Sequence, residues 1–113
     1  MTDCLFCKIV AGQIPSKKVY EDEHTFAFDD IDPKAPTHVL IVPKQHIRGL
    51  KEATAEEAEI VGLCHLTAAK IAGERGIEDG YRTVLNVGPK AGQSVFHLHV
   101  HLLGGRDLTW PPG

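Results

Sequence analysis

Three histidines alternate along one short segment of the chain, as His97, His99 and His101, with apolar residues between and around them. An extended strand repeats every two residues, so this spacing predicts a strand that presents all three imidazoles on one face. Phe96, Leu98, Val100 and Leu102 would then point to the opposite face, toward the core. Imidazole titrates near neutral pH, so the row can supply a nucleophile, a proton donor and a binder of anions or metal ions. A polar strand face without chemistry is the alternative.

A glycine-rich loop, residues 88–94, leads into this segment and ends in Gly92, Gln93 and Ser94. Such a turn can direct backbone N–H groups and the Ser94 hydroxyl at one point, and a concavity of donors binds anions. Phosphate suits it, because the donors and a cationic imidazole neutralise the charge while a neutral imidazole attacks phosphorus. The alternative is that these glycines only close a hairpin.

The remaining sequence pattern predicts the elements that position these residues. Strands are expected at residues 18–21, 24–28, 38–42, 81–87 and 95–103. A short helix is expected between Cys4 and Val10, and one long helix follows the capping box formed by Thr54 and Glu57. We therefore expect residues 1–113 to form a single α+β domain with a mainly antiparallel five-stranded sheet, one long helix and one short helix.

Composition narrows the class of protein. The net charge of −3 argues against a protein that binds duplex nucleic acid, which would carry a basic patch. The sequence offers neither a signal peptide pattern nor an apolar stretch of membrane-spanning length, which predicts a cytoplasmic protein without a membrane partner. Three cysteines, spaced as Cys4-x-x-Cys7 and a distant Cys64, suit a reducing compartment and metal or thiol chemistry better than disulfides.

With these residues in view, the chain resembles the histidine triad (HIT) nucleotide-binding family, whose signature is His-x-His-x-His with apolar residues at x. The resemblance is carried by Phe6-x-Lys8-Ile9, Ile14-Pro15, Phe28-x-Asp30-Ile31, Ala35 to His38, Pro43-Lys44-x-His46-Ile47, Asn86, Gly92 to Val95, the triad itself and the tail from Gly104 to Gly113. The tail, which ends in Trp110-Pro111-Pro112-Gly113, is most similar to the Hint branch, the purine nucleoside phosphoramidases.

The resemblance implies hydrolysis of an adenosine 5'-phosphoramidate, or an aminoacyl adenylate, to AMP. His99 would be the nucleophile that forms a covalent histidine–AMP, while His101 and Ser94 hold the phosphate and the leaving group. His38 and His97 would relay protons and set the tautomers of the row. The resemblance implies no metal or other cofactor for the chemistry.

The same resemblance assigns a nucleotide pocket. The residues that would bind the nucleotide, besides His99 and His101, are Phe28, Asp30, Ile31, Asn86, Gly92, Gln93 and Ser94. Within this set Asp30 would accept hydrogen bonds from the ribose hydroxyls, and Phe28 and Ile31 would line the purine slot. The residue before Asp30 is Asp29, where Hint proteins commonly have His, so an extra negative charge is expected near the pocket.

A subset of bacterial histidine triad proteins pairs a Cys-x-x-Cys with two histidines. Carried over to this chain, those ligands are Cys4, Cys7, His46 and His97, which would form a closed structural zinc site. A redox pair or an incidental pair of cysteines is the alternative.

The resemblance also implies a homodimer with a continuous sheet, in which Trp110 packs near the partner's active site. Three other functions remain open. A dinucleoside polyphosphate hydrolase or nucleotidylyl transferase would use the same His99 chemistry, and a regulatory module would bind AMP-like ligands without relying on turnover. A purely structural metal protein would use all three histidines as ligands, but it leaves Ser94 unexplained.

Overall fold

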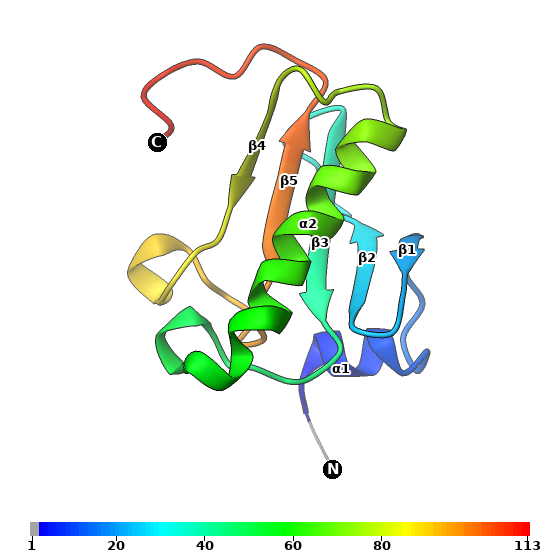
Figure 1. Cartoon of the computed structure of the whole chain (residues 1–113), viewed down its shortest axis with the longest axis vertical. Helices are drawn as coiled ribbons and strands as arrows, with labels where there is room; N and C mark the ends of the chain where they lie inside the picture. The colour runs from blue at the N-terminus through cyan, green and yellow to red at the C-terminus, as the bar shows by residue number, and fades with distance from the viewer. Residues whose placement is uncertain (1–2) are drawn as a thin grey trace.

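The computed structural model describes residues 3–113 and contains a five-stranded antiparallel sheet (Figure 1). The strands are β1 (Lys18–Glu21), β2 (Thr25–Asp29), β3 (Thr37–Pro43), β4 (Tyr81–Val84) and β5 (Val100–Gly104), in the order β1-β2-β3-β5-β4. The helices are α1 (Leu5–Val10) and α2 (Ala58–Glu74), with single 3-10 turns at Leu50–Glu52, Ala55–Glu57 and Pro89–Ala91. The predicted α+β class, with one long and one short helix, is confirmed.

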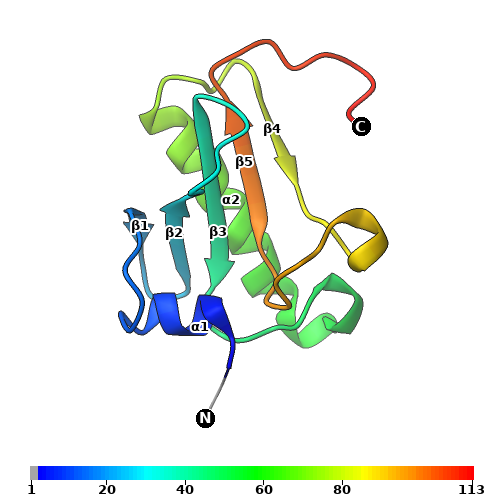
Figure 2. The same cartoon turned by 180° about the vertical axis from the view of Figure 1, so that it is seen from behind.

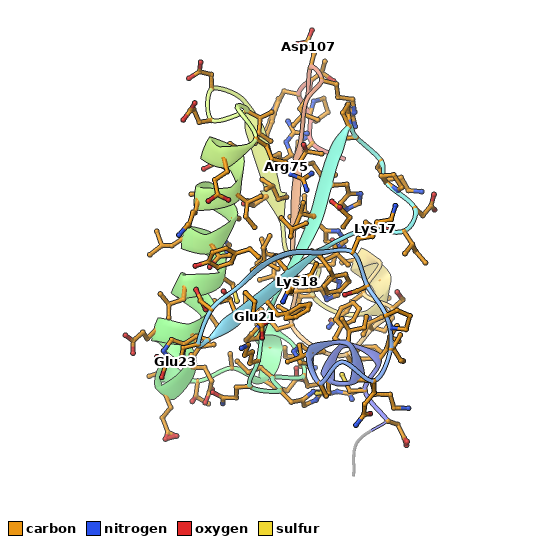
Figure 3. The ribbon with its side chains drawn as sticks, turned by 90° about the vertical axis from the view of Figure 1, so that its right-hand side faces the viewer. Lys17, Lys18, Glu21, Glu23, Arg75 and Asp107 are labelled. Atoms are coloured by element: carbon orange, nitrogen blue, oxygen red, sulfur yellow. The ribbon has the colours of Figure 1, made fainter. Side chains whose placement is uncertain are left out.

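The two helices cover opposite faces of the sheet (Figures 1 and 2). On one face, Val39, Ile41, Val100 and Leu102 pack against the Cys64 and Ile71 side of α2. On the other face, alternate residues of β2 and β3 pack against α1: Phe26, Phe28, Leu40 and Val42 contact Phe6 and Ile9. Seen edge-on, the sheet therefore separates a large helical layer from a small one (Figure 3). Both faces of β3 are covered, which accounts for its uninterrupted apolar sequence.

The 3-10 turn Ala55–Glu57, which leads directly into α2, and the end of α2 both carry the signals that the sequence predicts. The Thr54 hydroxyl accepts a hydrogen bond from a backbone N–H of the first turn, and the Glu57 carboxylate accepts one from the Thr54 N–H, so the capping box is present. At the other end Gly76 adopts a φ of +71°, which glycine tolerates without strain. Among residues 3–113, no helix is long and apolar enough to cross a membrane.

Two strands are shorter than predicted. β4 ends at Val84 rather than at residue 87, and β5 begins at Val100 rather than at residue 95. His97 and His99 therefore precede the strand, and the prediction that all three histidines share one regular strand is wrong. The cause is a competing hydrogen bond, because the Leu98 N–H donates to the Ile47 carbonyl at 2.7 Å instead of joining the ladder.

The β1–β2 turn depends on one carboxylate. Asp22 accepts hydrogen bonds from the N–H groups of His24 and Thr25, both at 2.8 Å, and from the hydroxyls of Tyr20 and Thr25. Partial burial raises the pKa of Asp22, but these four donors outweigh it and lower the pKa to about 2.

We expect Asp22→Asn to lower the free energy of unfolding at pH 7 by about 1 kcal/mol, a value reduced for solvent screening because the residue is exposed. A depressed carboxyl pKa stabilises the fold above the unfolded pKa near 4, and this contribution disappears as the pH falls toward 2. Urea unfolding at pH 7 and pH 2.5 checks this prediction: the difference in stability between wild type and variant should be clearly smaller at pH 2.5 than at pH 7. An equal difference at both values would contradict the assignment.

Candidate active site and metal centre

Two cysteines and two histidines meet where α1 approaches the segment before β5. These residues, Cys4, Cys7, His46 and His97, form a candidate metal site and are called the metal cluster below. The His97 Nδ1 lies 3.3 Å from Cys4 Sγ and 3.5 Å from Cys7 Sγ, while the His46 Nδ1 lies 3.4 Å from Cys7 Sγ and 3.2 Å from the His97 Nδ1. The structure thus brings together all four residues that the resemblance assigned to a metal, with their potential ligand atoms within 4.8 Å of one another.

The geometry of this cluster fits a tetrahedral metal ion. Ligand atoms around zinc, at Zn–S of about 2.3 Å and Zn–N of about 2.0 Å, lie about 3.3 to 3.8 Å apart, close to the separations seen here. The His97 Nε2–H donates to the Pro43 carbonyl at 2.8 Å, so the neutral ring presents the lone pair of Nδ1 to the cluster. Burial lowers the pKa of His97 to about 4, which keeps that lone pair available at neutral pH.

The middle histidine of the triad is held from two sides. The His99 Nδ1–H donates to the carbonyl of His97 at 2.8 Å, so the neutral ring carries its free lone pair on Nε2. The Phe6 ring packs edge-on against His99 with centroids 5.0 Å apart, and the His101 ring lies at the same centroid distance. The backbone oxygen that orients His99 therefore belongs to a residue of the metal cluster.

A chain of hydrogen bonds sets the tautomers of the other two imidazoles. The Lys34 N–H donates to His38 Nδ1 at 3.0 Å, which assigns the proton of a neutral His38 to Nε2. His38 Nε2 lies 2.9 Å from His101 Nδ1 and so donates to it, which leaves the proton of His101 on Nε2. The Asp30 carboxylate lies 3.4 Å from the same His38 nitrogen.

Burial keeps these rings neutral near pH 7. It lowers the pKa of His101 to about 4, with smaller contributions from His99 and His38. Burial also lowers the pKa of His99 and of His38, and the Asp30 carboxylate opposes the shift in both. The site thus combines one nitrogen lone pair, on His99, with one N–H donor, on His101.

The residues expected to bind the nucleoside lie at the His38 end of the row. Phe28 is buried in the cluster beneath α1, whereas Ile31 is fully exposed. Ile31, Asp30 and His38 line a cavity of about 630 Å³. The extra charge of Asp29 is paired, because Arg75 of the α2 C-terminus lies 3.1 Å from its carboxylate, a contact that no local pattern predicts.

The loop at residues 88–94 does not present the backbone N–H donors that the sequence predicts. The N–H groups of Gly92 and Gln93 donate to the carbonyls of Pro89 and Gly88, at 3.0 and 3.1 Å, so they are occupied within the turn rather than directed at an anion. The Ser94 side chain is exposed, and Asn86 is half-buried after β4.

The Gln93 side chain has a structural role that the sequence did not reveal. It is buried, accepts a hydrogen bond from the Gly88 N–H at 2.8 Å, and donates to the carbonyls of Arg48 and Val95 at 3.1 and 3.3 Å. These bonds attach the glycine-rich loop to the segment after β3.

Comparison with known proteins identifies the family of this chain. The HIT domain family matches residues 11–108. The chain is 53% identical over 111 residues to an uncharacterized HIT-like protein of Synechococcus elongatus, covering 98% of this chain and 97% of that protein. It is 52% identical over 111 residues to the 14 kDa zinc-binding protein of Zea mays, covering 96% of this chain and 87% of that protein.

Solved structures agree with the sequence comparison. A HIT family hydrolase from Legionella pneumophila superposes with a TM-score of 0.95 at 48% identity, covering 98% of this chain and 100% of the other. A HIT family hydrolase from Clostridium thermocellum superposes with a TM-score of 0.92 at 50% identity, covering 96% of each chain. Because the family model matches residues 11–108 and these relatives align with nearly the whole chain, the chain belongs to the HIT domain family.

Proposed function

We propose that this protein is a hydrolase of the Hint type, which cleaves adenosine 5'-phosphoramidates or aminoacyl adenylates to AMP through a covalent intermediate on His99. The observation that carries the proposal is the tautomer of His99. Its Nδ1–H is engaged by the His97 carbonyl at 2.8 Å, so Nε2 is the nucleophilic nitrogen. The names of the similar HIT family hydrolases support hydrolysis in general.

In the proposed reaction, His99 Nε2 attacks the phosphorus and the bond from phosphorus to the leaving group breaks. The hydrogen bonds through His38 place the proton of His101 on Nε2, and this N–H donates to the nitrogen of the leaving group. The leaving group takes a proton from solvent and departs as an amine. Water then attacks the phosphorus, releases His99 and yields AMP. The Ser94 hydroxyl is the donor we assign to the phosphate, because the neighbouring N–H groups of the turn are occupied.

Nucleotide recognition is assigned to the opposite end of the row. The Asp30 carboxylate would accept hydrogen bonds from the ribose hydroxyls. The Asp32 N–H donates to this carboxylate at 2.8 Å and so fixes its orientation. Phe28 and Ile31 would line the base, and Asn86 would complete the pocket around the phosphate, while Gly92 and Gln93 would shape the turn that carries Ser94 rather than donate their N–H groups. We therefore propose that this pocket binds AMP.

The metal cluster is proposed to hold a structural zinc ion. Four protein ligands, Cys4, Cys7, His46 and His97, would fill every position, so the ion would fasten the N-terminal segment to the sheet rather than activate water. The name of the similar 14 kDa zinc-binding proteins supports zinc as the ion.

Substrate profiling tests the proposed function. The purified protein is incubated with an adenosine 5'-phosphoramidate and, separately, with a diadenosine polyphosphate, and AMP release is followed. We expect efficient release from the phosphoramidate and little from the polyphosphate. The reverse order would assign the chain to the dinucleoside polyphosphate hydrolases, and binding without turnover to a regulatory module.

We also propose a homodimer that joins two sheets at β4. This strand is short and forms one edge of the sheet, where its backbone groups can pair with another strand. The tail beyond β5 contacts the start of this strand, since the Arg82 guanidinium donates to the Thr109 carbonyl at 2.8 Å, and Trp110 is 81% exposed. An exposed indole is typical of an interface, because its large apolar ring is covered when a partner binds.

Deletion of residues 110–113 is expected to alter the relative rates for different leaving groups several-fold while the fold is retained. The physical reason is that the Trp110 ring would lie beside the partner's leaving-group site. Light scattering checks the dimer, and circular dichroism checks the fold of the shortened chain. A wild-type protein that is monomeric at micromolar concentration would contradict both the dimer and the role of Trp110 at the partner's leaving-group site.

A further inference from the structure

Phe6 lies in α1 between the two cysteines of the metal cluster, and its buried side chain reaches the histidine row. Its ring packs edge-on against the His99 ring, with centroids 5.0 Å apart and an angle of 89° between the ring planes. It also packs edge-on against His97 and Phe28, with centroids 6.0 and 5.5 Å apart. One apolar ring therefore contacts both a member of the metal cluster and the proposed nucleophile.

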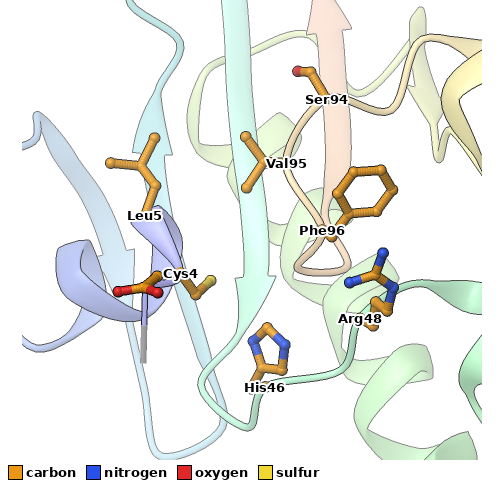
Figure 4. Close-up of a pocket in the computed structure, with 8 residues that line it drawn as sticks. Cys4, Leu5, His46, Arg48, Ser94, Val95 and Phe96 are labelled. Carbon is orange, nitrogen blue, oxygen red and sulfur yellow. The ribbon is translucent and has the colours of Figure 1, made fainter. Parts of the chain in front are cut away.

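The metal cluster fixes the position of Phe6. The helix that carries it has only six residues, so α1 draws little stability from its own hydrogen bonds. Cys4 caps the first turn by accepting a hydrogen bond from the Cys7 N–H at 3.4 Å, and the two sulfur atoms lie 3.3 and 3.5 Å from the His97 Nδ1. Figure 4 shows Cys4, at the start of α1, and His46, after β3, directed toward the same region. The contacts of both cysteines thus hold the turn on which Phe6 lies.

The His99 ring depends on support from outside its own segment. β5 begins at Val100, so His99 precedes the regular strand. The hydrogen bond from its Nδ1–H to the His97 carbonyl, at 2.8 Å, is made within that same short segment. Contacts from other elements therefore restrict rotation of the ring, and these come from Phe6 of α1 and His101 of β5.

We infer that Phe6 is a positioning residue for His99, an inference that rests on the proposed function. From α1, it holds the ring in the orientation that keeps Nδ1–H on the His97 carbonyl and presents Nε2 to the phosphorus. An attacking atom reacts only from a narrow range of positions, so a small displacement of the ring costs rate. Phe6 carries no reactive group, and its effect is therefore expected in kcat rather than in KM.

The test compares Phe6→Leu with Phe26→Leu, a matched control from the same apolar cluster. The two side chains are 4% and 5% exposed, and both rings contact Phe28, but within residues 3–113 only the Phe6 ring contacts a histidine ring. We expect Phe6→Leu to lower kcat for an adenosine 5'-phosphoramidate about tenfold with little change in KM, and Phe26→Leu to lower it much less. Circular dichroism and elemental analysis show that both variants keep the fold and the metal.

Hydrogen exchange without substrate gives a readout that does not depend on turnover. In protein with 15N-labelled histidine, the His99 Nδ1–H is followed by nuclear magnetic resonance at pH 7 and is assigned by its loss in His99→Ala. We expect this proton to exchange with solvent about tenfold faster in Phe6→Leu than in the wild type, and at the wild-type rate in Phe26→Leu. The His97 Nε2–H, which donates to the Pro43 carbonyl, should exchange slowly in both variants.

Equal exchange of the His99 proton in the two variants overturns the role of Phe6, whatever the turnover. Equal kcat values in the two variants overturn it as well. If the wild type releases no AMP from the phosphoramidate, the proposed hydrolase fails, and the exchange rates still decide whether Phe6 holds the His99 ring.

Discussion

Replacement of His99 by Ala is expected to reduce turnover of an adenosine 5'-phosphoramidate by at least about 10³-fold. The reason is that the His99 Nδ1–H donates to a backbone carbonyl and leaves a lone pair on Nε2, whereas Nε2 of His97 and of His101 carries the proton, and the covalent bond to phosphorus would form at the His99 Nε2. AMP should still bind, because Asp30, Phe28 and Ile31 are unchanged. Steady-state AMP release measures the loss, and calorimetric titration with AMP shows that the pocket persists.

The covalent intermediate gives this prediction a direct observable. Acid quenching of the wild type during turnover, followed by mass spectrometry of peptides, should locate an AMP adduct on the peptide that contains His99. His65→Ala, an exposed histidine on α2, serves as the matched control and should leave both turnover and adduct unchanged. Near-wild-type turnover by His99→Ala would remove the basis for a nucleotidyl-transferring hydrolase.

Loss of the metal centre is expected to produce the second large effect. Cys4→Ser should abolish stoichiometric zinc binding and lower the free energy of unfolding by about 3 kcal/mol or more, because structural zinc contributes its binding energy to folding. Turnover should fall by less than in His99→Ala. Some loss is expected because Phe6, adjacent to the cluster, packs against the His99 ring. Elemental analysis and chemical denaturation of protein prepared without chelators measure the two quantities.

Cys64→Ala provides the thiol control for this experiment. Cys64 lies on the buried face of α2, on the opposite side of the sheet from α1, and burial raises the pKa of its thiol to about 12, so the thiol is protonated. The variant should keep a full complement of zinc and lose only the stability expected from a small cavity. Wild-type protein without zinc, or full zinc in Cys4→Ser, would refute the assigned ligands.

Much of the scaffold follows from local sequence patterns. The capping box at Thr54 and Glu57 predicts the turn that leads into the long helix, and the apolar run through residues 38–42 predicts the central strand. Each pattern reports a hydrogen-bonding or burial requirement that is satisfied within a few residues. The short turn after Glu21 likewise predicts the β1–β2 hairpin. The Cys4 and Cys7 spacing indicates half of a metal site, but its two histidines were assigned through family resemblance rather than local pattern.

The sequence by itself thus determined the order and type of the elements and the chemical character of the histidine row. The tertiary structure decided which groups meet. Alternation predicted a strand through His97, yet the Leu98 N–H donates to Ile47, 51 residues earlier in the numbering, and β5 starts later. The Asp29 to Arg75 ion pair and the packing of Arg48 on Phe96 also join residues far apart in the chain. Such contacts depend on how helices and loops close over the sheet, and no short-range periodicity carries that information.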